Sequence, residues 1–253
     1  SELRPPAFGK KLVSFNADEA KKVKGVIDVI TIGEKVREFK KSGKRSWTFQ
    51  ISDSDKVVVI AENTWAAIKG KKALSAKWEI DSKVESTENH DKILTKILDG
   101  NQLNSRREDG NIKDAFVKAD KVLEKTYHSP FLPHNCMEPM NFYADVTSEK
   151  IHLVGPVQTP QAAEGVVADM FGVDKEKIHV EMTRMGGGFG RRLYGDFVYE
   201  AAEISHKIKK PVKLVSTRED DMTTGVYRPA IKYRIAAALK DGKVTGYHLK
   251  EAA

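Results

Sequence analysis

The sequence predicts an α+β protein made of two domains joined by a polar linker. Short β-branched segments alternate with helical segments in residues 1–81, and a stretch rich in Asp, Glu, Lys and Asn occupies residues 82–113. Strands, two helices and a final hairpin follow in residues 114–253. A chain of 253 residues, 40% of them hydrophobic, is long enough to bury the cores that these domains need.

The first domain contains two strand-helix-strand passes between residues 12 and 79. β-branched runs predict the strands, and an asparagine in the N-cap position predicts the start of a helix. The charged, aromatic segment 40–55 between the passes predicts an exposed hairpin or loop. The predicted strands are Val26–Ile32 and 57–61, the helix follows Asn63 over 64–74, and Trp78 closes the second pass.

The second domain begins near Asp114, after a linker whose one amphipathic stretch is 93–98. Its clearest helix has Thr159 as N-cap, Pro160 in the first position and Gly172 after the last turn. A two-residue turn, Asp241–Gly242, predicts the closing hairpin. The other predicted elements are the strands 122–127, Asn141–Val146, Ile151–Gly155, Ile178–Met182 and 212–216, the helix Asp196–Ile208, and the hairpin strands 231–239 and 243–250.

Composition narrows the classes of function. The net charge of +7 is spread over a surface where Lys and Arg alternate with Asp and Glu, which predicts no nucleic-acid partner. We find no apolar run of about 18 residues and no signal peptide, so no membrane segment is expected, and periplasm and cytoplasm both stay open. A single cysteine, Cys136, cannot form an internal disulfide or hold an iron–sulfur cluster by itself.

A glycine loop is the strongest candidate for a site. Residues 185–192 read Met-Gly-Gly-Gly-Phe-Gly-Arg-Arg and lie between a predicted strand and a predicted helix. Glycine leaves backbone N–H groups accessible to a ligand such as a phosphate, an oxo group or a flat cofactor. The loop matches neither the P-loop nor the dinucleotide fingerprint, and for three glycines taken alone a tight turn is the commoner interpretation.

A second cluster, residues 134–141, gathers His134, Cys136 and Glu138. The spacing matches no common zinc pattern, so a structural turn fixed by Pro133 and Pro139 is the favoured interpretation over a metal site. Cys136 is for the same reason expected to be a small buried residue. No Gly-x-Ser-x-Gly elbow is present, which argues against a serine hydrolase.

Three motifs resemble successive signatures of the large subunit of xanthine oxidase family molybdenum hydroxylases. Gln158 and Phe189 lie 31 positions apart (189 minus 158), which is the family's register between its molybdenum-side glutamine and its loop phenylalanine. Other segments are similar to the isoquinoline 1-oxidoreductase and aldehyde oxidoreductase types. The three motifs are 134–140, 157–161 and 185–192, and the other segments are 61–67, 218–222 and 227–230.

The resemblance implies a fold. Residues 1–81 would be part of an α/β hammerhead domain, residues 82–113 a linker, and residues 114–253 the N-terminal part of an α+β molybdopterin-binding domain.

The resemblance also implies a chemistry, in which water supplies the oxygen that replaces hydrogen at a C–H carbon of an aldehyde or N-heterocycle. Gln158 would donate to a molybdenum oxygen, and the loop of Gly187, Gly188, Phe189 and Gly190 would face the metal centre with the Phe189 ring beside a flat substrate. The expected cofactor is molybdopterin in its cytosine dinucleotide form, and the expected partner is an iron–sulfur subunit carrying 2Fe–2S clusters.

Two departures from the family's pattern refine these expectations. Purine-oxidising members carry Gly-Lys-Glu where this chain has Arg191, Arg192 and Leu193. Leu193 cannot accept a hydrogen bond, so we expect Phe189 and Leu193 to line a pocket for a small aromatic aldehyde or N-heterocycle. The family's catalytic glutamate has no match after Gly246, so we expect a fragment of a longer parent, inactive and without bound cofactor alone.

Two other functions stay open. A non-catalytic cofactor-chaperone or assembly module could use the same fold, and a downstream reading frame with the glutamate motif would argue against it. A basic nucleic-acid-binding protein would show a salt-dependent shift with DNA.

Overall fold

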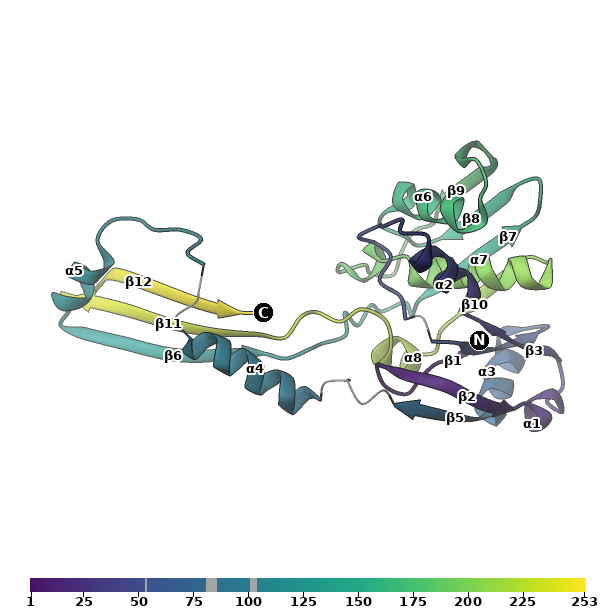
Figure 1. The fold of residues 1–253 in the computed structure, drawn as a ribbon, viewed down its shortest axis with the longest axis horizontal. Coiled ribbons are helices and arrows are strands. Elements are labelled where there is room, and N and C mark those ends of the chain that lie inside the picture. The colour runs from purple at the N-terminus through teal and green to yellow at the C-terminus, as the bar shows by residue number, and fades with distance from the viewer. Residues whose placement is uncertain (53, 81–85, 101–103) are drawn as a thin grey trace. The chain divides into compact units, whose positions relative to one another are not determined.

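The computed structural model describes residues 1–52, 54–80, 86–100 and 104–253, which form two compact units (Figure 1). The first comprises residues 1–84 and 133–227, and the second comprises residues 85–132 and 228–253. Mixed helices and sheets confirm the α+β class. This division differs from the sequence-based domains, because the described residues up to 80 are grouped with residues 133–227 of the predicted second domain. No helix in the described ranges is long and apolar enough to cross a membrane.

The N-terminal part of the first unit follows the predicted order of strands and helices. Asn63 caps α3 by accepting a hydrogen bond from the Ala66 N–H at 2.9 Å, as expected. The strands form a sheet in the order β1-β4-β3 and a separate β2-β5 pair. The elements are β1 Glu2–Leu3, β2 Lys10–Asn16, α1 Asp18–Lys21, β3 Val26–Ile32, α2 Glu34–Lys41, β4 Lys56–Ala61, α3 Thr64–Ala73 and β5 Ser75–Ile80.

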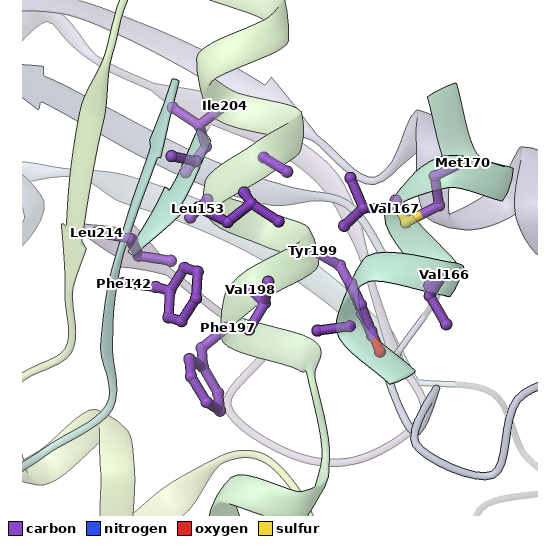
Figure 2. Close-up of a cluster of buried hydrophobic side chains, with 14 of the residues drawn as sticks. Phe142, Leu153, Val166, Val167, Met170, Phe197, Val198, Tyr199, Ile204 and Leu214 are labelled. Atoms are coloured by element: carbon purple, nitrogen blue, oxygen red, sulfur yellow. The ribbon is translucent and has the colours of Figure 1, made fainter. Parts of the chain in front are cut away.

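The rest of the first unit is a four-stranded sheet in the order β10-β7-β8-β9 with helices on one face. Phe142, Leu153 and Leu214 point from the strands toward α7 (Figure 2). Burial alternates along β7 and β8, so the other face of the sheet carries the polar side chains. The elements are β7 Asn141–Val146, β8 Ile151–Gly155, α6 Pro160–Phe171, η1 Lys175–Lys177, β9 Ile178–Met182, η2 Arg191–Leu193, α7 Asp196–Ile208, β10 Val212–Val215 and α8 Arg218–Thr223.

The segment 40–55 is less exposed than the sequence predicts. It begins in the last turn of α2, and its other described residues, 42–52, 54 and 55, belong to no helix or strand. Trp47 is exposed as expected, and residue 53 lies outside the described residues. Thr48 and Phe49, however, are buried against α7, where the Thr48 carbonyl accepts a hydrogen bond from the Gly195 N–H and the Phe49 ring lies 5.2 Å from Tyr199. The expectation of an exposed loop is therefore wrong for its aromatic centre, because a distant helix supplies the apolar partner.

The second unit is a three-stranded antiparallel sheet in the order β12-β11-β6. The predicted hairpin is confirmed, with both turn residues, Asp241 and Gly242, at positive φ. Within the predicted linker, the structure has the helix α4 and the start of α5, and α4 begins well before the expected amphipathic stretch. The elements are α4 Thr87–Asp99, α5 Ile112–Val117, β6 Lys121–Ser129, β11 Ile231–Lys240 and β12 Lys243–Ala252.

A buried ion cluster ties β1 and β4 to α7 in the first unit. The Glu200 carboxylate, fully buried, pairs with Arg4 and, at 3.1 Å, with Lys56 Nζ. Arg4 also lies 2.8 Å from Glu2 Oε2. Burial, together with repulsion from Glu200, raises the pKa of Glu2 to about 7.

This cluster makes the stability of the chain depend on pH. Because the folded state holds the Glu2 proton more tightly than the unfolded state, stability is lost as the pH rises toward 7. We expect Glu2 to lower the free energy of unfolding by about 2 kcal/mol between about pH 5 and about pH 7. Urea unfolding at both pH values checks this, and Glu2→Gln should remove that part of the difference. An equal pH difference in the wild type and the variant would contradict the assignment to Glu2.

Candidate functional site

The glycine loop joins the end of β9 to η2 and α7, as the sequence predicts. Gly187 and Gly190 have φ values of 101° and 92°, which favour glycine strongly. Phe189 between them has a φ of 50°, an uncommon conformation for a bulky residue, and its side chain is 63% exposed. The loop thus holds its aromatic ring outward at a cost of roughly 1–3 kcal/mol in backbone strain.

Glu138 fixes the first residue of the loop. Its backbone N–H donates to the Gly186 carbonyl at 3.0 Å, and its carboxylate accepts from the Gly186 N–H at 2.8 Å. Burial opposes ionisation, but hydrogen bonds from Gly186 and Asn141 and the charge of Arg192 together lower the pKa of Glu138. The predicted structural turn at 134–141 therefore holds the start of the loop in place by hydrogen bonds. In the described part of the chain, no group with metal-ligand spacing includes this turn.

Arg192 is the centre of the support beneath the loop, and its side chain is fully buried. Its Nε donates to the Gly187 carbonyl at 2.8 Å, and its Nη1 donates to the Pro156 carbonyl at 3.3 Å. Its Nη2 donates to the Glu138 carbonyl at 2.8 Å and to the Glu138 carboxylate at 3.1 Å. One guanidinium thus connects the loop, the end of β8 and the 134–141 turn.

Arg191 supports the loop from the other side. Its guanidinium forms a bidentate pair with Asp196, both contacts at 2.7 Å, at the first turn of α7. Burial would raise the pKa of Asp196, but the paired Arg191 charge outweighs it and lowers that pKa. Both arginines therefore have structural roles beneath the loop. Leu193, which follows them, is half-buried.

Gln158 and Gly188, both predicted site residues, lie against each other. A Cβ atom on Gly188 would lie 2.7 Å from Gln158 Oε1 and 3.2 Å from Met185 Sδ, so a side chain there would displace the amide from its present position. The Gln158 N–H donates to the Arg192 carbonyl at 2.9 Å, which fixes its backbone, while its side chain is exposed. The structure thus brings the predicted glutamine to the predicted loop.

Thr159, at the start of α6, also contacts the η2 segment. Thr159 occupies the N-cap position of α6 as predicted, but its side chain makes no capping hydrogen bond. Its hydroxyl instead donates to the Leu193 carbonyl at 2.8 Å. The helix start is therefore connected to the segment that follows the loop.

Cys136 is a buried residue, as the sequence suggests, and its thiol donates to the Gly188 carbonyl at 3.4 Å. Burial raises the pKa of the Cys136 thiol, which disfavours a nucleophilic thiolate. Arg218 of α8 donates to the carbonyls of Cys136 and Met137 at 2.7 and 2.6 Å. The turn beneath the loop is therefore held by charged hydrogen bonds from two directions.

The loop and Gln158 present a set of hydrogen-bond donors. Within the described residues, the N–H groups of Gly187, Gly188 and Gly190 donate to no protein acceptor, whereas that of Gly186 is used by Glu138. These amides and the exposed Gln158 amide suit oxygen atoms that carry negative charge. The donor set and the absence of a Cβ at Gly188 fit a molybdenum cofactor approaching this side of the loop.

Sequence reasoning missed the supports of the site. From the sequence, Glu138 is one residue of a favoured structural turn with a metal site as the alternative, and Arg192 occupies the position where purine-oxidising members of the family carry lysine. Charged residues adjoining a glycine loop are a signal that could have predicted such supports. The sequence does not identify the partners of Arg192, however, because Glu138 and Pro156 lie 54 and 36 positions away from it.

Residues 95–252 match the family described as the molybdopterin cofactor-binding domain. The chain is 28% identical over 240 residues to the membrane-bound aldehyde dehydrogenase [pyrroloquinoline-quinone] of Gluconacetobacter polyoxogenes, covering 94% of this chain and 29% of that protein. It is 32% identical over 140 residues to the isoquinoline 1-oxidoreductase subunit beta of Brevundimonas diminuta, covering 54% of this chain and 17% of that protein.

The fold is similar to that of quinoline 2-oxidoreductase from Pseudomonas putida 86, with a TM-score of 0.70 and 18% identity. That likeness covers 99% of this chain and 35% of the other. The chain thus spans about a third or less of the length of these relatives.

Proposed function

Because the chain belongs to the xanthine oxidase family of molybdenum hydroxylases through its molybdopterin cofactor-binding domain, we propose that the glycine loop and Gln158 form one wall of a hydroxylase active site. The observation that carries this proposal is the contact between the Gln158 side chain and Gly188, beside the N–H groups of Gly187, Gly188 and Gly190, which donate to no protein acceptor in the described residues.

A bound molybdenum cofactor would supply the two-electron oxidation that places a water-derived oxygen on the substrate carbon. The chain's own residues would bind and orient the cofactor and the substrate. Gln158 and the N–H groups of the loop would donate hydrogen bonds to oxygen atoms on the cofactor, and the buried Arg192 would keep these donors in place. The exposed Phe189 ring would form a flat wall beside the substrate.

We further propose which domains, cofactor and partner surround this site in the whole protein. Residues 1–81 would belong to a hammerhead domain, 82–113 to a connection and 114–253 to the N-terminal part of the molybdopterin-binding domain. The cofactor would be the cytosine dinucleotide form, a partner subunit with 2Fe–2S clusters would accept the electrons, and a glutamate outside this chain would act as the base.

We expect the whole protein to oxidise an aromatic aldehyde or N-heterocycle at least about tenfold more efficiently than a purine, because an apolar Leu193 offers no partner for the purine's polar edge. Steady-state assays with benzaldehyde, isoquinoline and hypoxanthine, alongside molybdenum analysis, test the proposal. Leu193→Glu is the matched variant and should improve hypoxanthine relative to isoquinoline. A preference of the wild type for hypoxanthine would contradict the role of Leu193. A full molybdenum content without turnover would favour the cofactor-chaperone alternative.

A further inference from the structure

Three side chains with metal-binding atoms lie together on the four-stranded sheet of the first unit. β8 and β9 are parallel neighbours, and His152 is the register partner of His179. Glu181 lies two residues beyond His179 on β9. Because side chains alternate along a strand, all three project from the same face of the sheet, the face opposite to the one that α6 and α7 cover.

The ligand atoms of this group are close to one another. One ring nitrogen of each histidine and one carboxylate oxygen of Glu181 all lie within 4.8 Å of one another. His152 Nε2 lies 3.7 Å from Glu181 Oε2, and the two imidazole rings are 5.3 Å apart. His179 and Glu181 are exposed, so a metal ion from solution can reach the group.

His152 supplies a second, independent indication. Its Nε2 atom is inaccessible to solvent and has no hydrogen-bond partner in the described residues. A buried ring nitrogen without a partner is uncommon, because the lost hydrogen bond to water is not replaced. The same nitrogen faces Glu181, so an ion between the two side chains would satisfy it.

We propose that His152, His179 and Glu181 bind one divalent transition-metal ion, for which Zn²⁺ is the suitable probe. Two imidazoles and one carboxylate are a common ligand set for zinc, with bond lengths of about 2.0–2.2 Å. Small rotations of the exposed His179 and Glu181 side chains would bring the three atoms to those distances. The fourth position would be open to water, so the ion would exchange with solution.

The strand beside β8 adds one acidic residue to this face of the sheet. Asp145 on β7 is the register partner of His152, so a second carboxylate projects from the same face of the sheet. Of the residues proposed for the glycine-loop site, none belongs to this group. The simpler alternative is a hydrogen-bonded pair of His152 and Glu181 without a metal, which predicts no affinity for zinc.

Isothermal titration of the full chain with ZnCl₂, after treatment with a chelator, tests the proposal. The wild type should bind one Zn²⁺ with an affinity that His179→Ala lowers by at least about tenfold, since even outer-shell changes cost that much at metal sites. Glu181→Gln keeps the shape and should also weaken binding. His248→Ala, which removes an exposed histidine from β12 in the other unit, is the matched control and should leave the affinity unchanged.

A spectroscopic measurement separates this site from loose binding to scattered histidines. Co²⁺ in place of Zn²⁺ should give visible absorption typical of low coordination number in the wild type and in His248→Ala, and lose it in His179→Ala. Absence of saturable zinc binding to the wild type would overturn the proposal. Equal affinities of the wild type and His179→Ala would overturn it as well.

Discussion

Replacing Arg192 by leucine should lower the free energy of unfolding of the chain by about 3–5 kcal/mol, the range typical of breaking a buried charged network. The guanidinium is fully buried and donates to the carbonyls of Gly187, Pro156 and Glu138. Leucine fills part of the volume but leaves these carbonyls without the guanidinium donor and removes the positive charge beside the Glu138 carboxylate, and each unmet buried group costs about 1–3 kcal/mol. Urea unfolding followed by circular dichroism measures the loss.

Two variants make this result specific. Arg192→Lys keeps the charge, but an ammonium cannot span the same acceptors, so the loss should be smaller than with leucine and still measurable. Arg184→Ala removes an exposed arginine just before the loop and should change stability by less than about 0.5 kcal/mol. A loss below about 1 kcal/mol for Arg192→Leu would show that the network beneath the loop relaxes without it.

Elements with local signals could be predicted from the sequence. Pro160 and Gly172 bracket α6 in the structure, and Gly172 has the left-handed φ of 64° that ends a helix. The strands Val26–Ile32, Asn141–Val146 and Ile178–Met182 have the predicted bounds. In each case, the residues that determine the element lie within it or directly beside it.

Elements that depend on distant partners could not be predicted. The helix α4 lies in a polar segment, and its apolar residues Leu94 and Leu98 are buried with Ala230 and Ala252 from the other end of the chain. Thr48 and Phe49 are likewise buried by a helix that begins more than 140 residues later. The amphipathic stretch 93–98 indicates an apolar face on the first of these segments, but no periodicity within either segment identifies the distant partner.

The candidate site, too, has one part that the sequence predicts and one part that depends on distant partners. The loop glycines and Gln158 belong to motifs that the sequence displays, and the structure places them in contact. Their supports, Glu138 and Arg192, are recognised only through hydrogen bonds between segments that are far apart in the chain. Hydrogen bonds from these residues to the Gly186 and Gly187 carbonyls fix the orientation of the loop, so these supports are part of how the site would work.

Gln158→Ala should lower the turnover of the whole protein by roughly 10²-fold and leave its fold intact, as loss of one preorganised donor to a charged oxygen commonly does. The side chain is exposed, and the backbone contact with Arg192 does not depend on it, so stability should be unchanged. The measurements are turnover at saturating substrate and urea unfolding of the same preparations. Molybdenum content should stay near that of the wild type, because Gln158 would be one of several hydrogen-bond donors to the cofactor.

Gly188→Ala provides the companion test, because it leaves Gln158 in place but moves its amide. The added Cβ would lie 2.7 Å from Gln158 Oε1, the end of a flexible side chain that can shift. Turnover should therefore fall as in Gln158→Ala, and the double variant should be no slower than either single variant. Gly165→Ala, a helix glycine whose Cβ would come no nearer than 3.7 Å to another atom, is the matched control and should keep full turnover. Wild-type turnover in both Gln158→Ala and Gly188→Ala would remove this amide from the active site and leave the loop as a structural turn.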